Sequence, residues 1–340
     1  MKTVEILQSL IHSIEVNPTS LYQIPWENVK QCLAMELDCR KELYPATQLE
    51  TIHKLFDSRF LGIEKHLALP DVSAIVSLLK ELVFALQLLP DTDYADSLTQ
   101  RIHFSETCLN HYVNNTIIVL GDSHVNFFSG NEFLTFLPIG NDINVCPNIT
   151  ANPFTALHLG PCLACHCNKP DTSTRFREKV DYLCNNFIKP NACIICCLGE
   201  IDLRVHVFRQ VKLQQRSYQD IVDDILSEYL SFLISLKEKG YQVFCWGPIA
   251  SQREVSPIDP AFPRNGTETE RNMATAYFNA QLAAKCRQHN IGFLSIFDQM
   301  ITEDFQTIET YLSADHCHLS QRALTLAQPL WKSMLYQFSR

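Results

Sequence analysis

The chain has 340 residues, of which 46% are hydrophobic and 19% are charged. This composition can bury a core and excludes the collagen-like, low-complexity and disordered classes. The net charge is −9, from 28 Lys and Arg against 37 Asp and Glu, and the chain has no block of basic residues. We therefore expect no general binding of nucleic acids.

The N-terminal segment and the cysteines indicate a cellular location. No uninterrupted apolar run reaches the ~18–20 residues needed to span a bilayer. The first 15 residues carry apolar side chains at helical spacing, broken by polar ones, which predicts an amphipathic helix rather than a signal peptide. Fourteen cysteines without an export signal predict free thiols in a reducing compartment, and so a cytoplasmic protein.

Residues 1–110 show helical periodicity and no motif that carries chemistry. The strongest pattern runs from Asp71 to Leu89, with a proline at each border and Asp71 as a candidate capping residue. A length of 340 residues favours two domains, at about 100–200 residues each. We expect residues 1–110 to form an all-helical accessory region, with a protein partner as one role for it.

Residues 111–340 alternate between strand and helix patterns. Apolar, β-branched or cysteine-rich runs predict strands at 116–120, 192–198, 241–246 and 291–296. Amphipathic patterns predict helices at 217–239, 268–289 and 319–338. This order predicts a three-layer α/β/α sandwich with a mostly parallel, flavodoxin-like sheet, whose sites form at the carboxyl ends of the strands. The stretches 126–152 and 247–266 are expected to wall the cleft.

Three short segments carry side chains suited to catalysis. Gly121-Asp122-Ser123-His124 follows the first predicted strand, and Gly199-Glu200-Ile201-Asp202-Leu203-Arg204 follows the second. Asp315-His316-Cys317-His318 precedes the last predicted helix. A carboxylate three residues before a histidine can fix the imidazole so that its other nitrogen takes a proton from a serine. Together the segments predict a Ser-His-Asp triad assembled by folding.

These segments, in this order, resemble the blocks of the SGNH hydrolases, also called GDSL esterases. The resemblance covers about residues 114–338 and leaves the first third of the chain outside. It implies that Ser123 is the nucleophile, His318 the general base and Asp315 the residue that orients it. It also implies that the N–H groups of Ser123 and of Gly160, in Leu157-His158-Leu159-Gly160-Pro161, form an oxyanion hole.

The chain departs from the family pattern in the segment that begins at Gly199. The family's Gly-x-Asn-Asp reads Gly-Glu-Ile-Asp here, so Ile201 stands where an amide would complete the oxyanion hole. Losing one such donor costs on the order of 10²–10³ in rate. Arg204 is our candidate substitute, although an ion pair of Glu200 with Arg204 that only closes the loop fits equally well. The side chains expected at the substrate are Asp122, His124, Glu200 and Asp202.

The sequence therefore predicts a serine esterase or acyl hydrolase that needs no cofactor. The Gly-Glu-x-Asp-x-Arg form of the Gly199–Arg204 segment, together with Gly-Asp-Ser-His and His-Leu-Gly-Pro, resembles a branch of the family associated with carbohydrate-modifying proteins, so an O-acylated carbohydrate is one candidate substrate. Two alternatives stay open: an O-acyltransferase that uses the same residues, and a binding module that has lost turnover.

A metal site is a separate alternative. Cys162, Cys165 and Cys167, with His166 between them and His158 upstream, offer enough soft ligands for tetrahedral zinc. No second Cys-x-x-Cys pair follows at a suitable spacing, so we expect no metal here.

Overall fold

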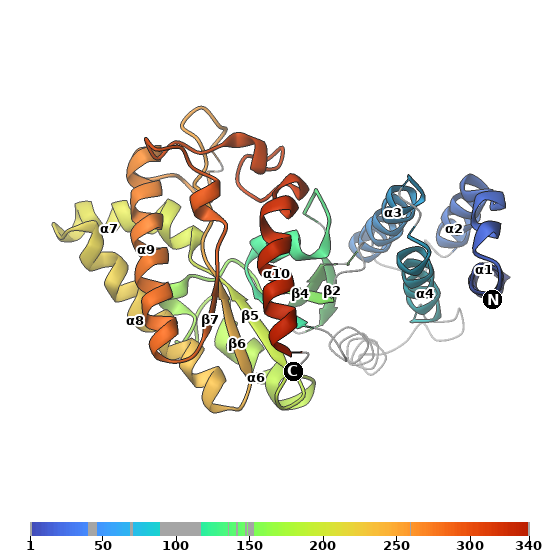
Figure 1. The fold of residues 1–340 in the computed structure, drawn as a ribbon, viewed down its shortest axis with the longest axis horizontal. Coiled ribbons are helices and arrows are strands. Elements are labelled where there is room, and N and C mark those ends of the chain that lie inside the picture. Colours follow the sequence, from blue (N-terminus) through green and yellow to red (C-terminus); the bar gives the residue numbers. More distant parts are fainter. Residues whose placement is uncertain are drawn as a thin grey trace. The chain divides into compact units, whose positions relative to one another are not determined.

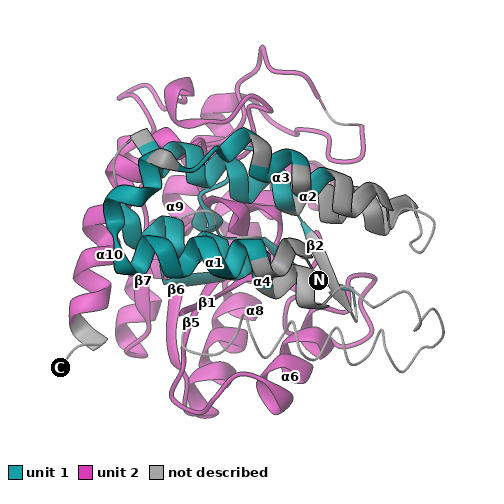
Figure 2. Cartoon of the chain, turned by 90° about the vertical axis from the view of Figure 1, so that its right-hand side faces the viewer, with its two compact units in different colours: residues 1–112, 128–156 teal, residues 113–127, 157–340 magenta. Residues whose placement is uncertain are grey.

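The structure is a computed structural model that describes residues 2–39, 46–68, 71–88, 117–134, 136–140, 142–146, 148, 153–258 and 260–338. It has two compact units, residues 1–112 with 128–156 and residues 113–127 with 157–340 (Figure 2). The domain border predicted between residues 110 and 111 lies outside the described residues. None of the helices in the described ranges is both long and apolar enough to cross a membrane.

The first unit begins with helices, as predicted. They are α1 (Lys2–Val16), η1 (Pro18–Gln23), α2 (Trp26–Cys39), α3 (Ala46–Ala68) and α4 (Val72–Leu88). The N–H of Ala74 bonds Asp71 Oδ1 at 3.0 Å, which confirms the predicted cap of α4. One core joins the apolar stripes of these helices, with Leu7, Phe60, Leu79 and Leu82 buried in it.

The first unit also contains strands that the sequence did not predict. β2 (Leu137–Gly140) pairs antiparallel with β3 (Ile143–Cys146), and β4 (Phe154–His158) begins in this unit. The stretch 126–152, interpreted as a cleft wall, thus includes two strands. Each is only four residues long, too short for a clear period-2 pattern.

The second unit is built on a parallel sheet. Its strands are ordered β4, β1 (Ile117–Gly121), β5 (Cys193–Cys197), β6 (Gln242–Trp246) and β7 (Gly292–Leu294), with the last two residues of β4 belonging to this unit. Every residue of β1 and of β5 is buried, as expected for strands covered on both faces. The α/β fold with a mostly parallel sheet is confirmed.

Helices cover both sides of this sheet, with α8 and α9 on one side and α10 on the other (Figure 1). The helices of this unit are α6 (Phe176–Asn186), α7 (Val207–Gln214), α8 (Tyr218–Glu238), α9 (Glu268–Gln288) and α10 (Leu324–Phe338). Capping boxes at Ser217 and Thr267 start α8 and α9 close to the predicted positions. The helix predicted at 319–338 starts at Leu324, because Ser320 caps a 3₁₀ turn, η8 (Gln321–Ala323), before it.

Candidate active site

Ser123 lies directly after the carboxyl end of β1. A Cβ at Gly121 would lie 2.0 Å from the main-chain oxygen of Cys197, so β1 and β5 approach closely here only because this residue is glycine. The turn continues as a 3₁₀ helix, η3 (Ser123–Ser129). Asp122 Oδ1 accepts the N–H of His124 at 3.0 Å and holds the turn, leaving the Ser123 hydroxyl for other contacts.

The structure brings Ser123, His318 and Asp315 into one hydrogen-bonded chain. Ser123 Oγ lies 2.7 Å from His318 Nε2, and His318 Nδ1 lies 2.6 Å from Asp315 Oδ2. The other carboxylate oxygen of Asp315 accepts bonds from the Ser313 hydroxyl and from the N–H groups of Cys317 and His318. Folding thus brings together Ser123 and His318, which are 195 positions apart in the chain. With Asp315 they have the arrangement of a serine nucleophile, its base and an orienting acid.

The electrostatics of the chain suit proton transfer from serine to histidine. Burial raises the pKa of Asp315, but its bond to His318 outweighs this and holds the pKa well below its usual range. Burial, together with the positive charge of His124, lowers the pKa of His318. At neutral pH the carboxylate is ionised and the imidazole is neutral, as a general base must be.

The loop after β4 brings Gly160 to the end of the same sheet. The N–H of Leu159 bonds the main-chain oxygen of Gly121 at 2.9 Å, which joins this loop to the turn before Ser123. Gly160 has φ +105°, a region that favours glycine. Lys179 Nζ donates to the Leu159 oxygen at 2.9 Å. The sequence analysis missed Lys179, although its spacing from Phe176 and Leu183 places it on the buried face of α6.

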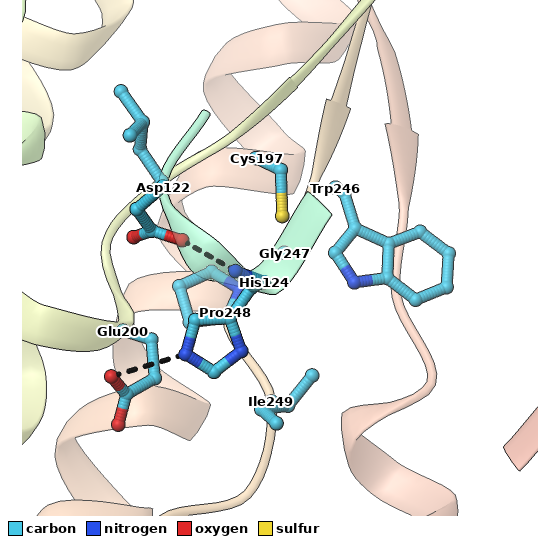
Figure 3. A pocket seen from close by; sticks show the side chains of 9 residues that line it. Asp122, His124, Cys197, Glu200, Trp246, Gly247, Pro248 and Ile249 are labelled. Carbon is cyan, nitrogen blue, oxygen red and sulfur yellow. Dashed lines mark hydrogen bonds and ion pairs between the residues drawn. The ribbon is translucent and has the colours of Figure 1, made fainter. Parts of the chain in front are cut away.

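A buried charge cluster lies next to the triad. Arg204 donates to Glu200 Oε1 at 2.6 Å, to Glu200 Oε2 at 3.1 Å and to the main-chain oxygen of Phe262 at 2.8 Å. His124 Nε2 lies 3.3 Å from Glu200 Oε2, and all three charged side chains are buried. Figure 3 shows the Glu200 carboxylate directed at the His124 ring. The structure therefore forms the Glu200–Arg204 pair and adds His124 to it.

The pKa values in this cluster favour the charged forms. Burial raises the pKa of Glu200, but the Arg204 charge and the His124 contact outweigh it and hold that pKa well below its usual range. Burial lowers the pKa of His124, and its contacts with Cys317 and Glu200 more than reverse this. Glu200 is thus held ionised between two positive groups.

Asp122 and Asp202, predicted at the substrate, are buried and bonded to main-chain groups. Asp202 accepts the N–H of Ala164 at 2.7 Å and of Cys165 at 3.3 Å, so it ties the segment after Gly160 to the segment after β5. Burial raises the pKa of each of these two carboxyl groups to about 6.

A small pocket lies behind His124 (Figure 3). It has a volume of about 10 Å³, enough for one water molecule. Its lining comprises Asp122, His124, Cys197, Leu198, Glu200, Trp246, Gly247, Pro248 and Ile249. The last three come from the 247–266 stretch predicted to wall the cleft, whereas Ser123 and His318 are not part of the lining.

The structure does not assemble the cysteine segment into a metal site. The thiols of Cys162 and Cys167 donate to the main-chain oxygens of Leu163 and Ala164. Across the described ranges, a single group of three or more side chains has the spacing to hold a metal ion, and it consists of His124, Cys317 and His318. The sequence analysis placed no metal there, because these residues are far apart in the chain.

No protein-family model matches the chain, and no curated protein matches it in sequence. Among solved structures, the chain is similar to a protein described as an acylhydrolase from Bacteroides fragilis, with 14% identity and a TM-score of 0.41 over 66% of this chain and 88% of that one. It is also similar to phospholipase A1 from Streptomyces albidoflavus, with 12% identity and a TM-score of 0.37 over 64% of this chain and 98% of that one. The proposed function therefore rests on the geometry of the site.

Proposed function

We propose that this protein is a serine ester hydrolase of the SGNH type, with Ser123 as nucleophile. The observation that carries the proposal is the unbroken chain from Ser123 Oγ through both nitrogens of His318 to Asp315, with distances of 2.7 and 2.6 Å. Such a chain activates a weak hydroxyl nucleophile, because the base is within bonding reach and is itself oriented.

The reaction proceeds in two halves. His318 Nε2 takes the proton of Ser123 Oγ as the oxygen attacks the ester carbonyl, and Asp315 stabilises the imidazolium that forms. The imidazolium then gives this proton to the leaving alcohol, and an acyl-serine results. Water, deprotonated by His318, attacks the acyl group and releases the acid, which restores Ser123.

The oxyanion of each tetrahedral intermediate needs donors aimed at it. The N–H groups of Ser123 and Gly160 fill this role in our proposal, and Arg204 takes the place of the amide that Ile201 lacks. Asp202 and Lys179 act as positioning residues, since they bond the segments on either side of Gly160. His124 and Glu200 lie beside the triad as candidate contacts for an ester such as an O-acylated carbohydrate.

Labelling with a fluorophosphonate tests the nucleophile, because this reagent phosphonylates an activated serine. We expect one adduct per chain on the wild-type protein, on Ser123 by peptide mass spectrometry, and none on Ser123→Ala. Ser227→Ala, which removes an exposed serine of α8, is the matched control and should label as the wild type does. An unlabelled wild type would contradict the hydrolase and support the binding module, and equal labelling of Ser123→Ala would refute the assigned nucleophile.

A further inference from the structure

Three side chains of types that can bind metals, those of His124, Cys317 and His318, lie close together beside Ser123. One ligand atom from each of His124, Cys317 and His318 lies within 4.8 Å of the other two. The two imidazole rings are 4.6 Å apart between centroids. His124 is buried and the other two side chains are half-buried, so a bound ion would be largely shielded from water.

The nitrogen atoms of the two rings are arranged as in metal sites. His124 faces Glu200 through Nε2, and its ring also contacts the side chain of Cys317. His318 faces Asp315 through Nδ1 at 2.6 Å, which leaves Nε2 on the side of Ser123. Histidines that bind metals characteristically place their second nitrogen on a carboxylate, which fixes the ring and increases the basicity of the ligand nitrogen. Both histidines here have that second partner.

We propose that His124 Nδ1, Cys317 Sγ and His318 Nε2 form a binding site for a zinc ion that reversibly blocks the Ser123 nucleophile. Two imidazoles and one thiolate form a ligand set that suits zinc, with a fourth position left for water or the Ser123 hydroxyl. The inhibitory consequence rests on the proposed function, whereas the metal site does not.

Binding changes the bonding of the catalytic base without any redox step. The lone pair of His318 Nε2 goes to the ion, so it can no longer accept the proton of Ser123. Cys317 binds as a thiolate and releases its proton to solvent, as does any imidazolium that becomes a ligand. Removing the ion restores the lone pair, and with it the hydrogen bond from Ser123.

The distances require a small closure around the ion. Zn–N bonds of about 2.0 Å and Zn–S bonds of about 2.3 Å in a tetrahedron place ligand atoms roughly 3.3–3.6 Å apart. The side chains must therefore approach one another by about an ångström. Once His124 has released its proton to become a ligand, Glu200, Asp315 and the Cys317 thiolate outnumber the positive charge of Arg204, so these charges favour a cation.

Cobalt(II) tests the site itself, because it replaces zinc and has visible d–d bands when tetrahedral and a charge-transfer band when bound to thiolate. The full chain, stripped with a chelator, is titrated with Co²⁺ alone. We expect both bands at one equivalent in the wild type and in Cys165→Ala, a control at another half-buried cysteine. Cys317→Ala should lose both, and His124→Phe, which keeps the thiol, should lose the tetrahedral bands. Absent bands in the wild type, or equal bands in folded Cys317→Ala, would overturn the site.

Fluorophosphonate labelling tests the block. Zn²⁺ should slow the labelling of Ser123 about tenfold or more in the wild type and in Cys165→Ala, with full recovery in chelator, but leave Cys317→Ala nearly unaffected. Cobalt bands with no change in labelling would overturn the inhibitory role. A wild type that never labels, even in chelator, contradicts the hydrolase instead, and the cobalt spectra still decide whether the site exists.

Discussion

Lys179 Nζ donates a hydrogen bond to the main-chain oxygen of Leu159 at 2.9 Å, in the peptide group whose N–H belongs to Gly160. A positive charge on the carbonyl side polarises this peptide group and fixes its orientation. The same peptide supplies one proposed donor of the oxyanion hole. If the Gly160 N–H is such a donor, we expect this lysine of α6 to act on the reacting atoms through one peptide group, without touching the substrate.

Replacing Lys179 with methionine should lower kcat more than it changes KM. The side chain keeps its length while the donor and the charge are lost, so the Gly160 N–H is less well aimed at the intermediate. We expect kcat to fall roughly tenfold to a hundredfold, somewhat less than for loss of an oxyanion donor itself. Steady-state kinetics on an activated aryl ester would measure this fall in kcat. The control is Lys189→Met, at an exposed lysine. An unchanged kcat in a folded variant would remove Lys179 from the mechanism.

Arg204→Met should destabilise the fold, because it leaves the Glu200 carboxylate buried with only His124 as a charged partner. Breaking a buried pair costs on the order of 3–5 kcal/mol in the free energy of unfolding. The double variant Glu200→Gln, Arg204→Met should regain much of this loss, since the buried carboxylate is then gone and His124, without its acidic partner, can be neutral. Urea unfolding would measure the stability of the single and the double variant. The control is Arg216→Met, which breaks an exposed ion pair with Asp224 and should have a much smaller effect.

The double variant also separates the two roles of Arg204. If Arg204 takes the place of the missing amide, the refolded double variant should still be far slower than the wild type. Near wild-type turnover in a stable double variant would show that the pair only closes the loop.

The contact of Ser123, His318 and Asp315 could be predicted because each of these residues follows a recognisable local pattern at a strand end or before a helix. The charge cluster was predicted in part, since Glu200 and Arg204 are four residues apart on one turn. His124 joins them through folding alone, as Cys317 joins His124, and no spacing in the sequence encodes either contact. Lys179 was missed because a lysine is normally expected to be exposed. Only the structure shows the acceptor that allows it to be buried, the Leu159 carbonyl.

Asp202 should make the stability of the fold depend on pH in an unusual direction. Burial raises its pKa from 3.8 to about 6, so between these values the folded chain holds a proton that the unfolded chain has released. Stability then falls as pH rises through this window, by up to about 3 kcal/mol, and is level above it. Asp202→Asn has no proton to lose and should lack this contribution.

Urea unfolding of the wild type and of Asp202→Asn between pH 4 and 7 would measure the difference. Groups that do not interact with Asp202 titrate alike in both proteins and cancel in the comparison, whereas Asp122, whose charge also raises the pKa of Asp202, adds a smaller difference. Identical pH slopes in the two proteins would mean that Asp202 is ionised throughout.

Gly121→Ala should disturb both the sheet and the nucleophile. The added Cβ would lie 2.0 Å from the Cys197 oxygen, and a main-chain atom in a buried strand cannot rotate away as a side chain could. β1 and β5 must therefore separate at their carboxyl ends, which we expect to cost about 3 kcal/mol or more in the free energy of unfolding. Gly240→Ala is the comparison, because its Cβ meets nothing within 4 Å and only its φ of +92° is strained.

The same separation would move Ser123, two residues further on, away from its 2.7 Å contact with His318. A misplacement of about 1 Å costs on the order of a hundredfold in rate. Under conditions where both variants are folded, Gly121→Ala should therefore label with fluorophosphonate far more slowly than Gly240→Ala. Equal labelling rates would show that the turn after β1 absorbs the strain, and that the close approach of the two strands is not what positions the serine.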